Sequence, residues 1–219
     1  SEVGFNLDFT DVEQARDVIT QALDNGVNFL DTAACYGISE ELIGLVVSER
    51  RSEFVLATKA GHYLPRGDGD DWTYDLITSS IDRSLERMKT EYVDLVQLHS
   101  CSIEILERGD VIRALQDAKA AGKTRHVGYS GDNESAKWAV TSGLFDTLQT
   151  SFNLVDQSAR MNLFADVEAN DMGLIVKRPI GNAVWGAAAD PRPYEHIPEY
   201  TIEYTRRAGV MRESGPLAN

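Results

Sequence analysis

A tyrosine that follows an aspartate by five residues is the most suggestive chemical feature of the sequence. Asp31 ends a short apolar segment, and Tyr36 lies in the turn before the next helical pattern. A phenol can give its proton to an oxygen that gains negative charge, but the ordinary pKa of tyrosine, about 10, makes it a reluctant acid. A nearby ammonium group lowers that pKa because it favours the phenolate. A cation that the fold brings close to Tyr36 would therefore assist the proton transfer.

Lys59 and His99 each close one of the apolar segments that follow. Lys59 would favour ionisation of Tyr36, and Asp31 would hold the lysine. A histidine such as His99 can donate a hydrogen bond to the oxygen that gains charge. Taken singly, these residues have ordinary explanations: a helix-capping acid, a solvated strand end and a core histidine. Because the four types occur together near successive strand ends, we favour a shared site.

Short β-rich segments alternate with helical patterns, which predicts a parallel sheet with helical connections. Strands are predicted at residues 2–5, 27–31, 54–59, 92–99, 126–130, 147–151 and 174–177. Helices are predicted at about residues 11–25, 39–48, 73–88, 103–121, 135–141, 157–170 and 198–207. We expect residues 1–219 to form one domain.

Two parallel folds suit such apolar strands: an open doubly wound α/β sheet and a closed (β/α)8 TIM barrel. Ser130 and Lys177 end predicted strands, as do Asp31, Lys59 and His99. Barrels place their chemistry at these carboxyl ends. A doubly wound dinucleotide-binding sheet would need a G-x-G-x-x-G segment after its first strand, and the sequence contains none. The barrel is therefore the predicted fold.

The segment DTAACYGISEELIG, residues 31–44, resembles the signature of the aldo-keto reductase family, D-T-A-x-x-Y-G-x-S-E followed by I-G. Lys59 and His99 close segments of the form that this family shows at its third and fourth strands, and the resemblance spans nearly the whole chain. It implies reduction of an aldehyde or ketone to an alcohol by hydride transfer from NADPH, with NADH as the alternative cofactor. It also implies that Tyr36 is the general acid and that Asp31, Lys59 and His99 complete a catalytic tetrad.

The resemblance further implies where the nicotinamide would bind. Ser130 and Gln149 occupy positions from which the family contacts the carboxamide, although Gln149 also has an ordinary explanation as a buried strand residue. Gly131 stands where the family usually has asparagine. That contact is therefore absent here, or a neighbour such as Asp132 or Asn133 makes it.

Lys177 and Arg178 stand where the family usually has an aromatic residue, which stacks on nicotinamide, and a serine. A lysine cannot stack in this way, but the pair can approach the cofactor phosphates, because barrels often bind phosphate after strands seven and eight. The ordinary alternative is a solvated basic pair. Cys35 is interpreted as a packing residue, since nothing in the sequence indicates a lowered thiol pKa.

Aromatic residues in loops on the predicted catalytic rim are candidates to line a substrate pocket, with simple loop packing as the alternative. These candidates are His62, Tyr63, Trp72 and Trp185. The acidic segment 67–71 lacks the spacing and the final glutamate of a calcium loop, so we predict a solvated loop there.

Composition restricts the class of protein. Of 219 residues, 42% are hydrophobic and 26% are charged, as in ordinary globular proteins. The formal net charge of −14 opposes binding to nucleic acid. The sequence shows no membrane span or signal peptide, and its two cysteines lack metal-ligand spacing. We expect a cytoplasmic protein with no metal, membrane or nucleic-acid contact, and the family resemblance implies a small carbonyl compound as its partner.

A parallel barrel needs eight strands, and only seven are predicted. The sequence also lacks counterparts of the family's loop after the first strand and of the elements that enclose the cofactor's adenosine half. Without them a sheet edge and an apolar interior would face solvent. We expect further residues, disordered in the cofactor-free protein, to complete the barrel. Truncation and completion by a partner are the alternatives, and an intact-mass measurement tests the expected disorder.

Two classes of function stay open at this point. The first is the NADPH-dependent reductase, in which the tetrad reduces a carbonyl compound. The second is a regulatory or sensor subunit that keeps the fold and binds NADPH without catalysis, which an intact tetrad does not exclude. Turnover of NADPH with a panel of small aldehydes separates the two.

Overall fold

The computed structural model describes residues 12–62, 64, 70–184 and 199–214. Over these residues, one sheet contains six strands in chain order, and each strand is parallel to its neighbours. The strands are β1 (Phe29–Asp31), β2 (Val55–Ala60), β3 (Val93–His99), β4 (Thr124–Ser130), β5 (Thr147–Ser151) and β6 (Gly173–Lys177). A doubly wound sheet would reverse its strand order, whereas a barrel keeps it. The predicted fold class is confirmed over these strands.

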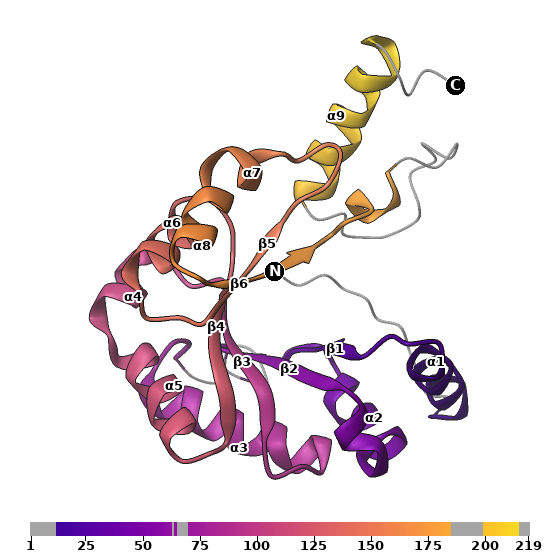
Figure 1. Cartoon of the computed structure of the whole chain (residues 1–219), viewed down its shortest axis with the longest axis vertical. Coiled ribbons are helices and arrows are strands. Elements are labelled where there is room, and N and C mark those ends of the chain that lie inside the picture. The colour runs from indigo at the N-terminus through magenta and orange to yellow at the C-terminus, as the bar shows by residue number, and fades with distance from the viewer. Residues whose placement is uncertain (1–11, 63, 65–69, 185–198, 215–219) are drawn as a thin grey trace.

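The helices follow the outer side of the curved sheet from α2 round to α8 (Figure 1). They are α1 (Val12–Asp24), α2 (Ser39–Val46), α3 (Tyr74–Met88), α4 (Ile103–Arg108), α5 (Asp110–Ala120), α6 (Asn133–Ser142), α7 (Ser158–Asn162), α8 (Phe164–Ala169) and α9 (Glu199–Ser214). Short 3-10 helices occupy Ser48–Glu53 and Gly181–Ala183. Each strand from β2 to β5 is thus followed by helix before the next strand begins, as in a barrel.

Six of the seven predicted strands are confirmed, and the first, at residues 2–5, lies outside the described residues. Two helices that were each predicted to be continuous are interrupted in the structure. The helix predicted at 103–121 breaks at Gly109, whose φ of 79° interrupts the helical path and suits glycine. The helix predicted at 157–170 breaks at Leu163, where φ is −127°. The last predicted helix extends beyond residue 207 to Ser214.

The core is centred on β3, in which all seven residues are buried. Helices α3 and α5 pack over the outer side of the sheet with buried aliphatic side chains that include Ile77, Ile81 and Leu115. Each such side chain contributes about 1.5–3 kcal/mol when it leaves water. No helix in the described part of the chain is long and apolar enough to cross a membrane. The packed helices hold the strand ends, and therefore the residues near them, in fixed relative positions.

Candidate active site

Asp31 and Lys59 form an ion pair near the carboxyl ends of neighbouring strands. Lys59 Nζ lies 2.7 Å from Asp31 Oδ2 and donates to the carbonyl oxygen of Thr32 at 2.9 Å. Lys59 is only 2% exposed, and this burial lowers its pKa although Asp31 favours the charged form. The pair places a buried ammonium group at the rim of the sheet.

Tyr36 lies beside this ammonium group. The centroid of its ring is 5.2 Å from Lys59 Nζ and 5.6 Å from the ring centroid of His99, which it meets edge to face. The chain turns at Tyr36, since its N–H donates to Ala33 O and its carbonyl accepts from the N–H of Ser39. Tyr36 is 43% exposed, so an incoming molecule can reach it. The structure therefore brings Asp31, Tyr36, Lys59 and His99 into one group.

His99 is buried and electrically neutral. Burial, assisted by the positive charge of Lys59, lowers the pKa of His99 to about 2. At pH 7 the imidazole can donate one hydrogen bond but carries no extra proton. Its Nδ1 lies 3.4 Å from Cys35 Sγ. The interpretation of Cys35 as a packing residue was thus incomplete, because its thiol contacts a residue of the candidate site.

The buried His99 should make the fold sensitive to acid. In the unfolded chain histidine has a pKa of about 6.5, whereas in the fold the pKa of His99 is about 2. As the pH falls from 6.5 toward 2, the unfolded chain takes up a proton that the folded chain does not bind. The free energy of unfolding therefore falls by up to about 1.4 kcal/mol per pH unit over this range. Urea unfolding at neutral and mildly acidic pH measures this loss of stability, which should be smaller in His99→Phe than in the native protein. Parallel pH dependences would contradict this expectation.

Hydrogen bonds connect the expected carboxamide-binding residues to Asp31. Ser130 Oγ donates to Gln149 Oε1 at 2.8 Å, and Gln149 Nε2 donates to Asp31 Oδ2 at 3.1 Å. Gln97 Nε2 approaches Asp31 Oδ1 at 3.4 Å. Ser130 and Gln149 are buried and therefore adjoin the tetrad as one polar network. Gln97 was not predicted, but its position two residues before His99 on β3 was a usable signal, since such residues share a face.

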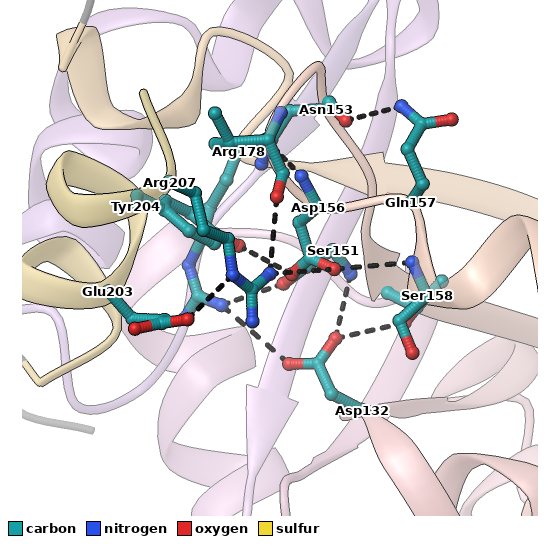
Figure 2. Close-up of polar contacts among 12 residues, drawn as sticks. Asp132, Ser151, Asn153, Asp156, Gln157, Ser158, Arg178, Glu203, Tyr204 and Arg207 are labelled. Atoms are coloured by element: carbon teal, nitrogen blue, oxygen red, sulfur yellow. Dashed lines mark hydrogen bonds and ion pairs between the residues drawn. The ribbon is translucent and has the colours of Figure 1, made fainter. Parts of the chain in front are cut away.

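Lys177 and Arg178 lie in a separate cluster around Asp132. Lys177 Nζ is 3.1 Å from Asp132 Oδ2. Arg178 Nη1 is 3.6 Å from the same oxygen and donates to Ser151 Oγ at 2.7 Å (Figure 2). Burial disfavours the carboxylate, yet Lys177 and hydrogen bonds from Ser151 and Thr150 hold the pKa of Asp132 below its usual value. Both basic side chains are less than one fifth exposed. They are therefore not a freely solvated pair.

A polar cavity of about 450 Å³ adjoins this cluster. Acidic and basic side chains line it together and pair with one another, as Arg207 does with Glu203 at 2.8 Å and Arg178 with Asp132 (Figure 2). None of the four tetrad residues lines this cavity. It is therefore distinct from the candidate active site.

Tyr129 explains why this chain has glycine at position 131. A Cβ at Gly131 would lie 2.5 Å from Cε1 of Tyr129 and 2.8 Å from its hydroxyl oxygen, which donates to Cys101 O at 2.6 Å. Asp132, one candidate for the missing carboxamide contact, has both carboxylate oxygens engaged. Asn133, the other candidate, is exposed at the start of α6. Ser130 and Gln149 are therefore better placed than Asp132 or Asn133 for the expected carboxamide contact.

Asparagine at position 131, which is usual in the family, should therefore destabilise this fold. Gly131→Asn is expected to lower the free energy of unfolding by about 1–3 kcal/mol, because the buried ring of Tyr129 has to move. Gly209→Ala is the control, since nothing lies within 4 Å of its new Cβ in α9 and alanine should stabilise that helix by about 0.5–1 kcal/mol. Urea denaturation measures both changes. An unchanged midpoint for Gly131→Asn would refute the steric explanation.

Two of the residues expected at a substrate pocket, Tyr63 and Trp185, lie outside the described residues, as does most of the acidic segment 67–71. His62 and Trp72 lie near the tetrad, and the ring centroid of His62 is 5.5 Å from that of His99. Asp71 is exposed, as expected for a solvated loop, and it also contacts His62, with 2.9 Å between Oδ2 and Nδ1. No sequence pattern indicates that pairing, because it depends on how the loop folds back.

Comparison with known proteins identifies the family. The family model described as Aldo/keto reductase family matches residues 4–195. The uncharacterized oxidoreductase YqkF of Bacillus subtilis is 30% identical over 182 residues, 80% of this chain and 58% of that protein. The holo form of aldo-keto reductase AKR11C1 from Bacillus halodurans matches with a TM-score of 0.77 and 25% identity, over 94% of this chain and 70% of that one.

A third match shares the fold at lower identity. It is an aldo-keto reductase from Klebsiella pneumoniae, solved in complex with NADPH, with a TM-score of 0.66 and 21% identity over 82% of this chain and 61% of that one. The chain spans less than two thirds of the length of YqkF. The family match nevertheless extends over most of the chain, including the whole candidate site. On this evidence the chain belongs to the aldo/keto reductase family.

Proposed function

We propose that the protein reduces an aldehyde or a ketone to an alcohol with NADPH. The observation that carries this proposal is the position of an accessible phenol beside a buried ammonium group and a neutral imidazole. Tyr36 lies 5.2 Å from Lys59 Nζ, measured from its ring centroid, and beside His99. A carbonyl oxygen that gains negative charge needs a proton donor and a hydrogen-bond donor, and this group supplies both.

Tyr36 gives its proton to the substrate oxygen in this proposal. Lys59 favours that transfer because its positive charge stabilises the phenolate that remains. Asp31 holds the ammonium group at 2.7 Å, and Gln97 and Gln149 in turn hydrogen-bond to Asp31. The network therefore fixes the cation from one side, and the exposed Tyr36 side chain faces the incoming substrate.

His99 orients the substrate oxygen and stabilises the charge that develops on it. With a pKa of about 2 it stays neutral, so it acts as a hydrogen-bond donor and not as an acid. If the Cys35 thiol donates to Nδ1, the hydrogen of the neutral ring is on Nε2, from which it can donate to the carbonyl. A thiol that donates in this way would select the tautomer that the proposed reaction needs.

The residues near the strand ends fit a nicotinamide cofactor. Ser130 and Gln149 offer a hydroxyl and an amide, which match the donors and acceptors of a carboxamide. Lys177 and Arg178 lie together at the end of β6, where their positive charges can attract the cofactor phosphates. When bound, NADPH supplies the hydride. The family, and the NADPH complex of the Klebsiella pneumoniae protein, support this cofactor, with NADH as the second choice.

Steady-state oxidation of NADPH with a panel of small aldehydes and ketones tests the proposal. We expect turnover that depends on both the cofactor and the carbonyl compound, and slower turnover with NADH. Binding of NADPH without any turnover across the panel would instead favour the regulatory subunit. A cytoplasmic location remains a prediction from composition.

A further inference from the structure

Glu40 is a buried acidic side chain close to the tetrad that the proposed reaction does not use. It lies in the first turn of α2, four residues after Tyr36, and is only 1% exposed. A carboxyl group is buried at a cost unless hydrogen bonds replace its contacts with water. Thr58 Oγ1 supplies such a bond, since it donates to Glu40 Oε1 at 2.6 Å and is itself buried. This contact ties the start of α2 to β2.

The bond between Glu40 and Thr58 joins the segment that carries Tyr36 to the strand that carries Lys59. Consecutive strand residues point to opposite faces of a sheet, so Lys59 faces the tetrad while Thr58 faces α2. At the other end of the contact, the N–H of Ser39, the residue before Glu40, donates to Tyr36 O at 3.0 Å. A short path of covalent and hydrogen bonds thus connects the phenol to the ammonium group.

Arg87 of α3 holds the same segment from a third element. Its Nη1 lies 3.4 Å from Glu40 Oε2 and 3.5 Å from Ala34 O. The N–H of Ala34 donates to Lys59 O at 3.1 Å. A Cβ at Gly44 would lie 2.1 Å from Arg87 O, so the backbones of α2 and α3 are in direct contact. Both ends of the segment from Ala34 to Glu40 are therefore fixed against β2 and α3.

We infer that Glu40 is a positioning residue that sets the distance between the Tyr36 phenol and the Lys59 ammonium group. The inference rests on the proposed function, in which Lys59 stabilises the phenolate that remains after proton transfer. The ring centroid of Tyr36 lies 5.2 Å from Lys59 Nζ, and the attraction between the two groups weakens as they separate. Misplacement by about 1 Å can slow an enzyme about 10²-fold. Glu40 acts through the backbone of the Tyr36 segment and not by contact with substrate.

Thr58→Val tests this inference because valine has nearly the shape of threonine but cannot donate to Glu40. We expect kcat for carbonyl reduction to fall about 10- to 100-fold while the KM for NADPH changes little. We also expect Tyr36 to ionise at higher pH than in the native protein, because its phenolate lies farther from the ammonium group. Thr58→Ser keeps the hydroxyl and should restore most of the activity and the native ionisation.

Titration of the phenolate absorbance measures the ionisation of Tyr36 without turnover. The difference between each protein and the same protein with Tyr36→Phe separates this residue from the other tyrosines. Thr124→Val is the matched control. Thr124 is also buried and its hydroxyl donates to His126 O at 2.8 Å, but it begins β4, at the opposite end of that strand from Ser130. Its loss should alter neither kcat nor the titration of Tyr36.

Glu40→Asp gives a second reading, because the shorter side chain keeps the acid but withdraws it from Thr58. It should lower kcat and displace the titration of Tyr36 in the same direction as Thr58→Val. If no carbonyl compound is reduced while both variants displace the titration, the proposed function fails and the role of Glu40 stands. An unchanged titration and an unchanged kcat in both variants would overturn the inference and leave the proposed function intact. Equal losses in Thr58→Val and Thr58→Ser would also contradict it, since the hydroxyl would not be their cause.

Discussion

Replacement of Tyr36 by phenylalanine is expected to lower kcat for carbonyl reduction about 10²- to 10⁴-fold, the range that general acids contribute. The hydroxyl acts in the transition state, where the substrate oxygen takes up a proton, so the dissociation constant of NADPH should change little. The ring remains and keeps its contacts with Lys59 and His99. Steady-state kinetics and a fluorescence titration with NADPH measure the two quantities.

Tyr74→Phe is the matched control for that substitution. The Tyr74 hydroxyl donates to Asp117 between α3 and α5, on the outer side of the barrel, so its loss should leave turnover unaltered. Full activity in Tyr36→Phe would remove the tyrosine from the proposed chemistry. A loss of equal size in both variants would indicate a general effect on the fold.

Lys59→Met should produce the second large effect, a fall in kcat of about 10²-fold or more with a displaced pH profile. Without the ammonium group the phenolate of Tyr36 loses its stabilising charge, so the limb of the profile that reports this ionisation should move to higher pH. Asp31 keeps its hydrogen bonds from Gln97 and Gln149, so we expect the variant to fold.

Lys119→Met is the matched control for Lys59→Met. Lys119 pairs with Asp146 at 2.7 Å, the same distance as in the Lys59–Asp31 pair, but it lies on α5 away from the tetrad. Its loss should change neither kcat nor the pH profile. A pH profile in Lys59→Met that matches the native one would count against the pairing of Lys59 with Tyr36.

Strand ends were predictable because the apolar pattern of each strand stops at a polar residue. Asp31, His99, Ser130 and Lys177 each end their strand, and Lys59 is the penultimate residue of β2. Since the strands are parallel and neighbours in chain order, these residues had to meet along one edge. The sequence therefore indicated the fold class and where the residues of the candidate site gather.

Pairings between distant side chains were not predictable in the same way. Gln149 contacts Asp31 across 118 residues, and that contact depends on the curvature of the sheet. Lys177 was expected at the cofactor phosphates, and nothing in its own segment indicates that Asp132 binds it. Asp71 contacts His62 only because Trp72 folds back onto Gly61. Local pattern specifies the elements, whereas these contacts depend on packing between them.

Transfer of deuterium to a carbonyl substrate from NADPH that carries deuterium at both C4 positions tests the central proposal most directly. The purified protein is incubated with this cofactor and an aldehyde, and the alcohol is analysed by mass spectrometry. Our account predicts an alcohol with one deuterium on the former carbonyl carbon, formed in proportion to the NADPH oxidised. An absence of labelled alcohol from a protein that binds NADPH would contradict it and would make a non-catalytic binding role the better explanation.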